Sequence, residues 1–171
     1  MSEQAIVVRR RGAFPRGGVT LRGFAVLFTL TAPDGTVLAE ADEVARPGSD
    51  DVIFRDRSGA ELLAVRWAPD EQRISIGGEE RAVFTRNGRA MQVHLAGEPD
   101  DIVLRGGPVR PPWWSLRRQM RVPGDTRWKL DDPTGRAALG IELRRNNFHA
   151  RFSGMDHLMA AGLTVAVTRS R

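Results

Sequence analysis

The last segment of the chain, GMDHLMAAGLTVAVTRSR at residues 154–171, decides the fold. Asp156 is a residue type that suits a helix N-cap, and an uncharged apolar stretch follows it. Apolar side chains fall on every side of a helical wheel: Leu158, Met159, Ala160, Ala161, Leu163, Val165, Ala166 and Val167. A helix that is apolar all round must be buried all round, so we predict a buried helix at about 156–168.

A strand is the competing interpretation of this segment, because the stretch TVAVT contains β-branched residues. The Leu-Met-Ala-Ala start and a length of about twelve residues favour the helix. A membrane-spanning helix needs ~20 apolar residues, so the segment is too short to cross a bilayer.

Most of the remaining chain shows the period-two alternation of apolar and polar residues that is typical of strands. The clearest stretches are GFAVLFTLT, MQVHLAG, GRAALGIEL and NFHARFSG. Turn sequences separate such stretches: APDG at 32–35, DRSG at 56–59, RNG at 86–88 and DDPTG at 131–135. Strands spaced by such turns predict a meandering antiparallel barrel or sandwich, and an all-apolar helix would fill the interior of a barrel.

The composition is that of a globular protein with a basic surface. The chain has 171 residues, a hydrophobic fraction of 41% and a formal net charge of +5. This length suits one domain over residues 1–171. Lys129 is the only lysine among 26 basic residues. Arginine suits anionic partners, although a GC-rich genome also favours its codons.

The absence of cysteine removes disulfides, thiolate nucleophiles and thiolate metal ligands. The first residues show no apolar run after a basic region, so we expect no secretory signal. These features predict a cytoplasmic protein. If it associates with a membrane, we expect it to bind peripherally.

Catalytic groups are few in this sequence. His94 and His149 fall on the polar sides of predicted strands, and His157 falls in the first turn of the predicted helix. The paired aspartates precede strands or lie in turn sequences, where turn chemistry explains them. No nucleophilic triad, metal-ligand spacing or phosphate-binding glycine loop is evident. We therefore predict a non-enzymatic protein with no cofactor and no metal.

Two arginine-rich segments are the candidate binding residues. Arginine beside interfacial tryptophan suits anionic lipid headgroups, and the same pair would also serve nucleic acid. The simpler alternative is that the tryptophans belong partly to the core and that the arginines form solvated strand faces. The candidate residues are Arg9, Arg10, Arg11 and Arg16 in the first segment, and Trp113, Trp114, Arg117, Arg118 and Arg121 in the second.

The order of these motifs resembles the LURP-one-related family, which belongs with the tubby-like proteins and the phospholipid scramblases. The resemblance covers most of the chain from about Ala5 onward, with about twelve strands expected from the family. It is carried by VIFRDRSGAELLAVRW, RWKLDDPTGRAALGIEL and FHARFSGMDHLMAAGLTVAVTR. Gly154 and Asp156 fall where family members place the turn into the central helix.

The resemblance implies a mainly β fold: a closed antiparallel barrel of about twelve strands around a buried, hydrophobic C-terminal helix. Thr168 and Arg169 stand where the family often has an acidic residue. The chain has neither an acidic calcium loop nor cysteines for acylation, which argues against scramblase activity.

Tubby-like proteins bind phosphoinositides through basic surface residues, so the resemblance implies a binding or scaffold domain at an anionic membrane surface. A nucleic-acid-binding barrel is the first alternative, and an enzyme with an unrecognised site is the second. A protein partner is a further possibility.

Overall fold

The computed structural model describes residues 4–10, 26–32, 34–43, 51–96, 102–109, 127–144 and 147–169, with side chains described for all but residues 9, 10, 26, 27, 42, 43 and 169. The strands are β1 (Gln4–Arg10), β2 (Val26–Thr31), β3 (Val37–Glu43), β4 (Val52–Arg55), β5 (Glu61–Trp67), β6 (Glu71–Ile76), β7 (Glu79–Asn87), β8 (Ala90–Leu95), β9 (Ile102–Pro108), β10 (Arg127–Asp131), β11 (Ala137–Arg144) and β12 (Asn147–Phe152). The helix α2 (His157–Arg169) follows them.

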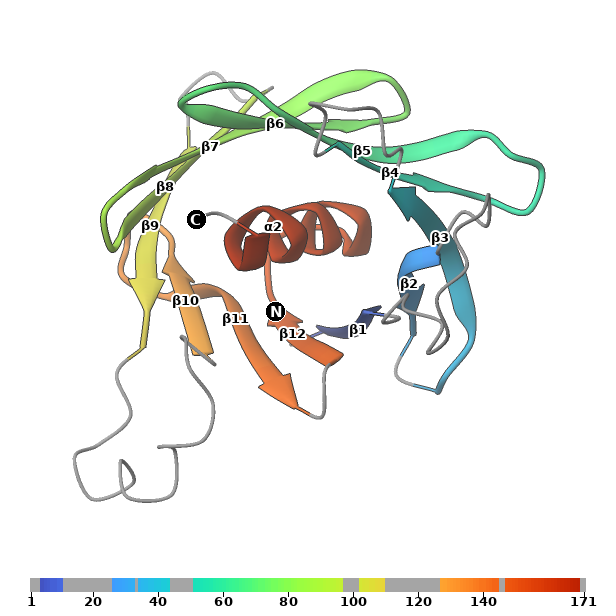
Figure 1. Ribbon diagram of the computed structural model, residues 1–171. Coiled ribbons are helices and arrows are strands. Elements are labelled where there is room, and N and C mark those ends of the chain that lie inside the picture. The colour runs from blue at the N-terminus through green and yellow to red at the C-terminus, as the bar shows by residue number, and fades with distance from the viewer. Residues whose placement is uncertain are drawn as a thin grey trace, which may run out of the picture.

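The twelve strands form a closed barrel in which each strand pairs with its neighbours in the sequence. Every pairing is antiparallel, and β12 closes the barrel by pairing with β1. Figure 1 shows the strands as a ring with α2 inside it. The predicted mainly β barrel around a C-terminal helix is therefore confirmed.

Alternation of buried and exposed residues along the strands follows the sequence pattern. Met91 and Val93 of β8 are buried, whereas Gln92 and His94 are exposed. The strand β2 is buried on both sides, because Thr29 and Thr31 of its outer face are also covered. The predicted strands with one face on the core are thus confirmed.

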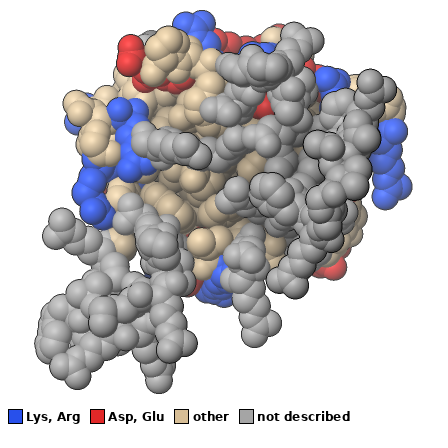
Figure 2. Space-filling model, viewed as in Figure 1, with Lys and Arg blue, Asp and Glu red and all other residues tan. Residues whose placement is uncertain are grey.

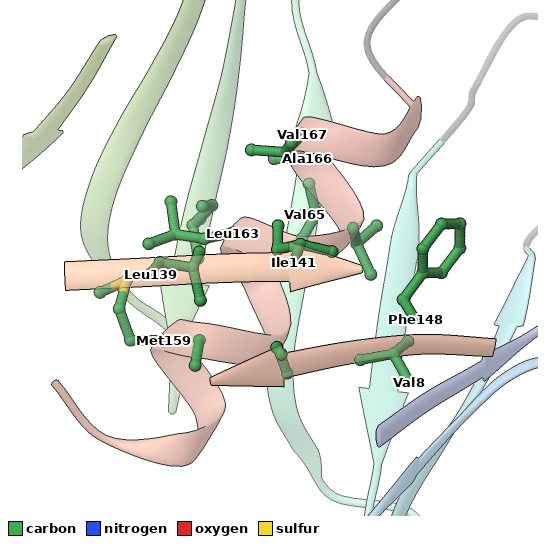
Figure 3. Packing of buried hydrophobic residues seen from close by; sticks show 14 of the residues in the cluster. Val8, Val65, Leu139, Ile141, Phe148, Met159, Leu163, Ala166 and Val167 are labelled. Carbon is green, nitrogen blue, oxygen red and sulfur yellow. The ribbon is translucent and has the colours of Figure 1, made fainter. Parts of the chain in front are cut away.

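The helix α2 is buried around its whole circumference along most of its length. Met159, Leu163, Val165 and Val167 are all buried, and Leu158 in the first turn is partly buried. These side chains join strand residues such as Val65 and Leu139 in one core (Figure 3). The predicted all-round burial follows from the absence of any charged side chain between the two ends of the helix.

Local hydrogen bonds define where α2 starts and how it keeps polar groups inside the barrel. The Met159 N–H donates to Oδ1 of Asp156 at 2.8 Å, so Asp156 is the N-cap and the helix itself begins at His157. The buried Thr164 hydroxyl donates to the Ala160 carbonyl oxygen at 2.7 Å. The hydroxyl group therefore needs no partner on the barrel wall.

Gly162 allows α2 to approach the barrel wall at β5 and β6. A Cβ at this position would lie 2.7 Å from Cγ2 of Ile74 and 3.0 Å from Cδ1 of Leu63. Glycine costs helix stability, so its presence in mid-helix is explained by this close approach. The helix lies closest to β1, β5, β6 and β12.

The antiparallel order gives the barrel two distinct ends. The connections that follow β1, β3, β5, β7, β9 and β11 attach at one end, which we call the loop end. The connections that follow the even-numbered strands attach at the other, which we call the turn end. The strand β12 ends at the turn end, so α2 enters the barrel from there.

Two hairpins of the turn end have the same hydrogen-bonding pattern. Oδ1 of Asp56 accepts from the N–H and hydroxyl of Ser58 and from the Ala60 N–H. Oδ1 of Asp132 accepts equivalent bonds from Thr134 and Arg136. These bonds lower the pKa of both aspartates, chiefly through the hydroxyl groups. Gly59 and Gly135 follow with φ of 88° and 81°, which explains the glycine of the predicted turn sequences.

Replacing Leu163 with aspartate is expected to prevent folding. Leu163 has 0% exposure at the centre of the barrel, and a carboxylate there would be buried without a partner. Leu38→Asp is the control, because Leu38 on β3 is 37% exposed. Thermal unfolding by circular dichroism checks both variants. A cooperative native transition for Leu163→Asp would contradict the central position of α2.

The variant Gly162→Ala is expected to lose about 1–3 kcal/mol of unfolding free energy, the usual cost of overpacking a core. The gain in helix propensity, about 1 kcal/mol, acts in the opposite direction. The control is Gly140→Ala on β11, where a Cβ would meet nothing within 4 Å. Urea unfolding of the two variants measures the difference. A Gly162→Ala protein more stable than the wild type would show that α2 does not approach Ile74 closely.

Candidate functional site

The residues predicted to bind anions fall mostly outside the described part of the chain. The structure describes only the backbone of Arg9 and Arg10, at the end of β1. The other predicted residues lie outside the described residues: Arg11, Arg16, Trp113, Trp114, Arg117, Arg118 and Arg121. Their role in binding stays a prediction.

The two arginine-rich segments attach to the barrel at the same end. Residues 11–25 leave β1 and rejoin the barrel at β2, while 109–126 leave β9 and rejoin at β10. Both are connections of the loop end. The order β1-β12-β11-β10 places the two attachment points three strands apart around the barrel.

Three charged side chains lie near the loop end of β10 and β11. Glu142 accepts from Arg127 at 2.9 Å and is also bonded to Arg144. The hydrogen bond from Arg144, with a further contribution from Arg127, lowers the pKa of the Glu142 carboxyl although partial burial opposes the shift. Two arginines on one carboxylate leave an excess positive charge here.

The turn between β7 and β8 adds two more arginines at the loop end. Nε of Arg86 donates to the Gly88 carbonyl oxygen at 2.7 Å, which holds this side chain along the turn. Arg89, the next residue after Gly88, is exposed. The strands β7, β10 and β11 and this turn thus bring four arginines to the loop end: Arg86, Arg89, Arg127 and Arg144.

The outer faces of the barrel differ in charge balance. On β5–β7 the cations are matched by carboxylates: Arg66 with Glu61, Arg73 with Glu71 and Glu80, and Arg81 with Glu79. On the outer face of β9–β12 the cations outnumber the carboxylates. The outward charges there are Arg105, Arg127, Lys129, Arg144 and Arg151 against Asp131 and Glu142.

Figure 2 shows part of this contrast around the rim of the molecule. Acidic and basic side chains alternate along the upper edge, over β5–β7, whereas basic side chains gather on the side of β8 and β9. The sequence analysis missed the basic face of β9–β12. Its residues are scattered along four strands, so only the pairing register brings them together.

The three histidines do not converge on one place in the described structure. His94 is exposed on β8, His149 is half-buried on β12, and His157 is exposed at the start of α2. Within the described residues, no group of three or more His, Asp or Glu side chains lies close enough to hold a metal ion. In the same part of the chain, no helix has both the length and the apolar content to span a membrane.

Comparisons with known proteins give a fold but no family. No family model and no curated protein matches the chain. A solved structure of a protein from Arabidopsis thaliana, AT5G01750, is similar, with a TM-score of 0.60 and 15% sequence identity. The match covers 96% of this chain and 90% of that one, so the two share the whole architecture. At this identity the likeness defines the class by its fold alone: barrels closed around a central helix.

The carboxyl pKa of Glu142 is expected to rise in the variant Arg144→Gln, because the largest cause of its lowered pKa is removed. A carboxyl with a lowered folded pKa stabilises the fold above its unfolded pKa. That stability is lost as the pH falls through the folded value. The contribution should stay below about 1 kcal/mol, as for exposed ion pairs.

Carboxyl NMR titration from about pH 6 downward, through the ordinary glutamate value, measures this shift. Arg73→Gln on the opposite face is the control and should leave Glu142 unchanged. An unaltered Glu142 titration in Arg144→Gln would show that the pair does not form in solution.

Proposed function

We propose that the protein is a non-enzymatic binding domain that attaches to anionic phospholipid surfaces through the loop end of its barrel. The observation that carries this proposal is the shared attachment of both arginine-rich segments at that end. The resemblance to tubby-like proteins, which bind phosphoinositides, supports the same class of ligand.

The sequence of the connections strengthens the electrostatic case. The six connections of the loop end, 11–25, 44–51, 68–70, 88–89, 109–126 and 145–146, contain ten arginines and four aspartates. Those of the turn end, 32–36, 56–60, 77–78, 96–101, 132–136 and 153–156, contain two arginines and seven acidic residues. An anionic surface would therefore attract one end and repel the other.

Tryptophan gives this end a second property that suits a bilayer. Trp113 and Trp114 belong to the same connection as Arg117, Arg118 and Arg121. Aromatic rings partition to the headgroup region, where their apolar body and polar N–H are both accommodated. Arginines beside them would meet lipid phosphates. Val109, 43% exposed at the start of this connection, adds apolar surface.

Liposome co-sedimentation tests the proposal with neutral phosphatidylcholine vesicles and vesicles that also contain phosphatidylserine. Binding to the anionic vesicles alone, weakened by salt, is expected. The variant Arg117→Gln/Arg118→Gln should bind about tenfold to thirtyfold more weakly, at about 1 kcal/mol for each arginine near the surface.

The matched control removes two arginines from the opposite end, Arg57→Gln/Arg136→Gln, and should bind as the wild type does. Equal losses in the two double variants would mean that net charge, not the loop end, drives binding. Full displacement of the protein from vesicles by duplex DNA would identify a general polyanion binder instead.

A further inference from the structure

A continuous row of residues crosses the outer face of five neighbouring strands. The pairing register places Lys129 of β10 opposite Gly140 of β11, and Gly140 opposite Arg151 of β12. Gly107 of β9 lies beyond Lys129, and Ala5 of β1 lies beyond Arg151. The long cationic side chains of Lys129 and Arg151 therefore flank Gly140, a position of β11 that carries no side chain.

Neither packing nor backbone conformation explains the glycine at position 140. A Cβ there would meet nothing within 4 Å, and Gly140 is not among the glycines with positive φ. By contrast, a Cβ on Gly107 would overlap the carbonyl oxygen of Arg89, which is a structural reason for that glycine. Glycine weakens a strand interior, and one use of it is to let a ligand approach the sheet. The open space lies above Gly140, between the two cations.

The charges around Gly140 do not cancel. Nζ of Lys129 lies 2.8 Å from Oδ1 of Asp131, and Arg105 is the cross-strand partner of Asp131. The Arg151 side chain is exposed and makes no hydrogen bond or ion pair within the described residues. The three cations Arg105, Lys129 and Arg151 thus face one carboxylate. This leaves an excess of two positive charges.

A second described carboxylate on this face, that of Glu142, does not repel an anion bound over Gly140. Glu142 follows Gly140 by two residues on the same face of β11. Arg127 and Arg144 both bind it, so its charge is already compensated. The row runs obliquely along the barrel wall: Gly107 is one residue from the loop end of β9, Lys129 is at the middle of β10, and Arg151 is one residue from the turn end of β12.

We propose that Lys129, Gly140 and Arg151 form a site for a phosphomonoester. Adjacent strands lie about 4.8 Å apart, so the two cationic residues are separated by about 10 Å at their Cα atoms. Their side chains can reach a phosphate seated over Gly140 from both sides. A phosphomonoester carries about −1.5 to −2 at pH 7, which matches the excess of two charges, whereas a phosphodiester carries only one.

This inference rests on the proposed function in one respect: if the protein attaches to a membrane, the phosphomonoester belongs to a lipid headgroup. The planar guanidinium group of Arg151 and the compact ammonium group of Lys129 both donate hydrogen bonds to phosphate oxygens. A soluble phosphate ester has the same chemistry, so the experiment includes an arm for it.

The experiment compares vesicles of phosphatidylcholine with phosphatidic acid, a monoester, and with phosphatidylglycerol, a diester, at equal surface charge. The wild type should prefer phosphatidic acid. Arg151→Gln should reduce binding to phosphatidic acid about tenfold, the effect of losing one charge-assisted contact. Binding of this variant to phosphatidylglycerol should change by less than about threefold, because there the variant loses only the general attraction of one exposed charge to the surface.

Gly140→Leu fills the space without altering any charge and should cause the same loss of preference. Arg73→Gln removes one charge from the balanced β5–β7 face and should keep the preference. Unchanged selectivity in both Arg151→Gln and Gly140→Leu would overturn the site.

Titration with inorganic phosphate, followed by amide NMR, separates this site from the proposed membrane attachment. Shifts at Lys129, Gly140 and Arg151 that are lost in Gly140→Leu would support the site even if no vesicle is bound. In that case the membrane attachment fails and a soluble ester is the ligand. Vesicle binding without selectivity and without these shifts would keep the attachment and overturn the phosphomonoester site.

Discussion

Burial of an entirely apolar helix is the constraint on which the rest of this structure depends. The helix α2 has no polar face to offer to water, so a wall must surround it on all sides. A closed barrel does this and also removes the unpaired strand edges of an open sheet. Gly162 and the internally bonded Thr164 are the local adjustments that let the helix fit against that wall.

A barrel filled in this way leaves its charged side chains on the outside. Buried side chains of α2 and the strands form one hydrophobic core in the interior. Charged side chains are left to the outer strand faces and the two ends. The antiparallel order then sorts the connections strictly between these ends, so the charge of each end is set by alternate connections in the sequence. This sorting attaches two arginine-rich segments, about a hundred residues apart in the chain, to the same end of the barrel.

The helix and the strands could be predicted from the sequence because their determinants are local, whereas the number of strands was implied by the family resemblance. The N-cap Asp156, the uncharged stretch after it, and the alternation in β8 and β12 each involve residues close together in the chain. The candidate site was predictable only in part. The register of β10 against β11 decides whether Lys129 lies opposite Gly140 or opposite a residue next to Gly140. This register shifts between Leu130 and Asp131. A shift of one residue reverses the faces, and no local pattern specifies it.

The contrast between two faces of the same barrel explains why register matters for function. On β5–β7, cross-strand and same-strand carboxylates pair with the arginines, which is how a strand face becomes soluble without attracting a partner. On β10–β12, Gly140 stands where a residue could pair with Lys129 or Arg151, and the Arg151 side chain makes no ion pair within the described residues. Solubility alone would be served by either arrangement. An open strand position between two cations, one of them without an ion pair in the described structure, is instead what an anionic ligand requires, because it supplies both space and charge.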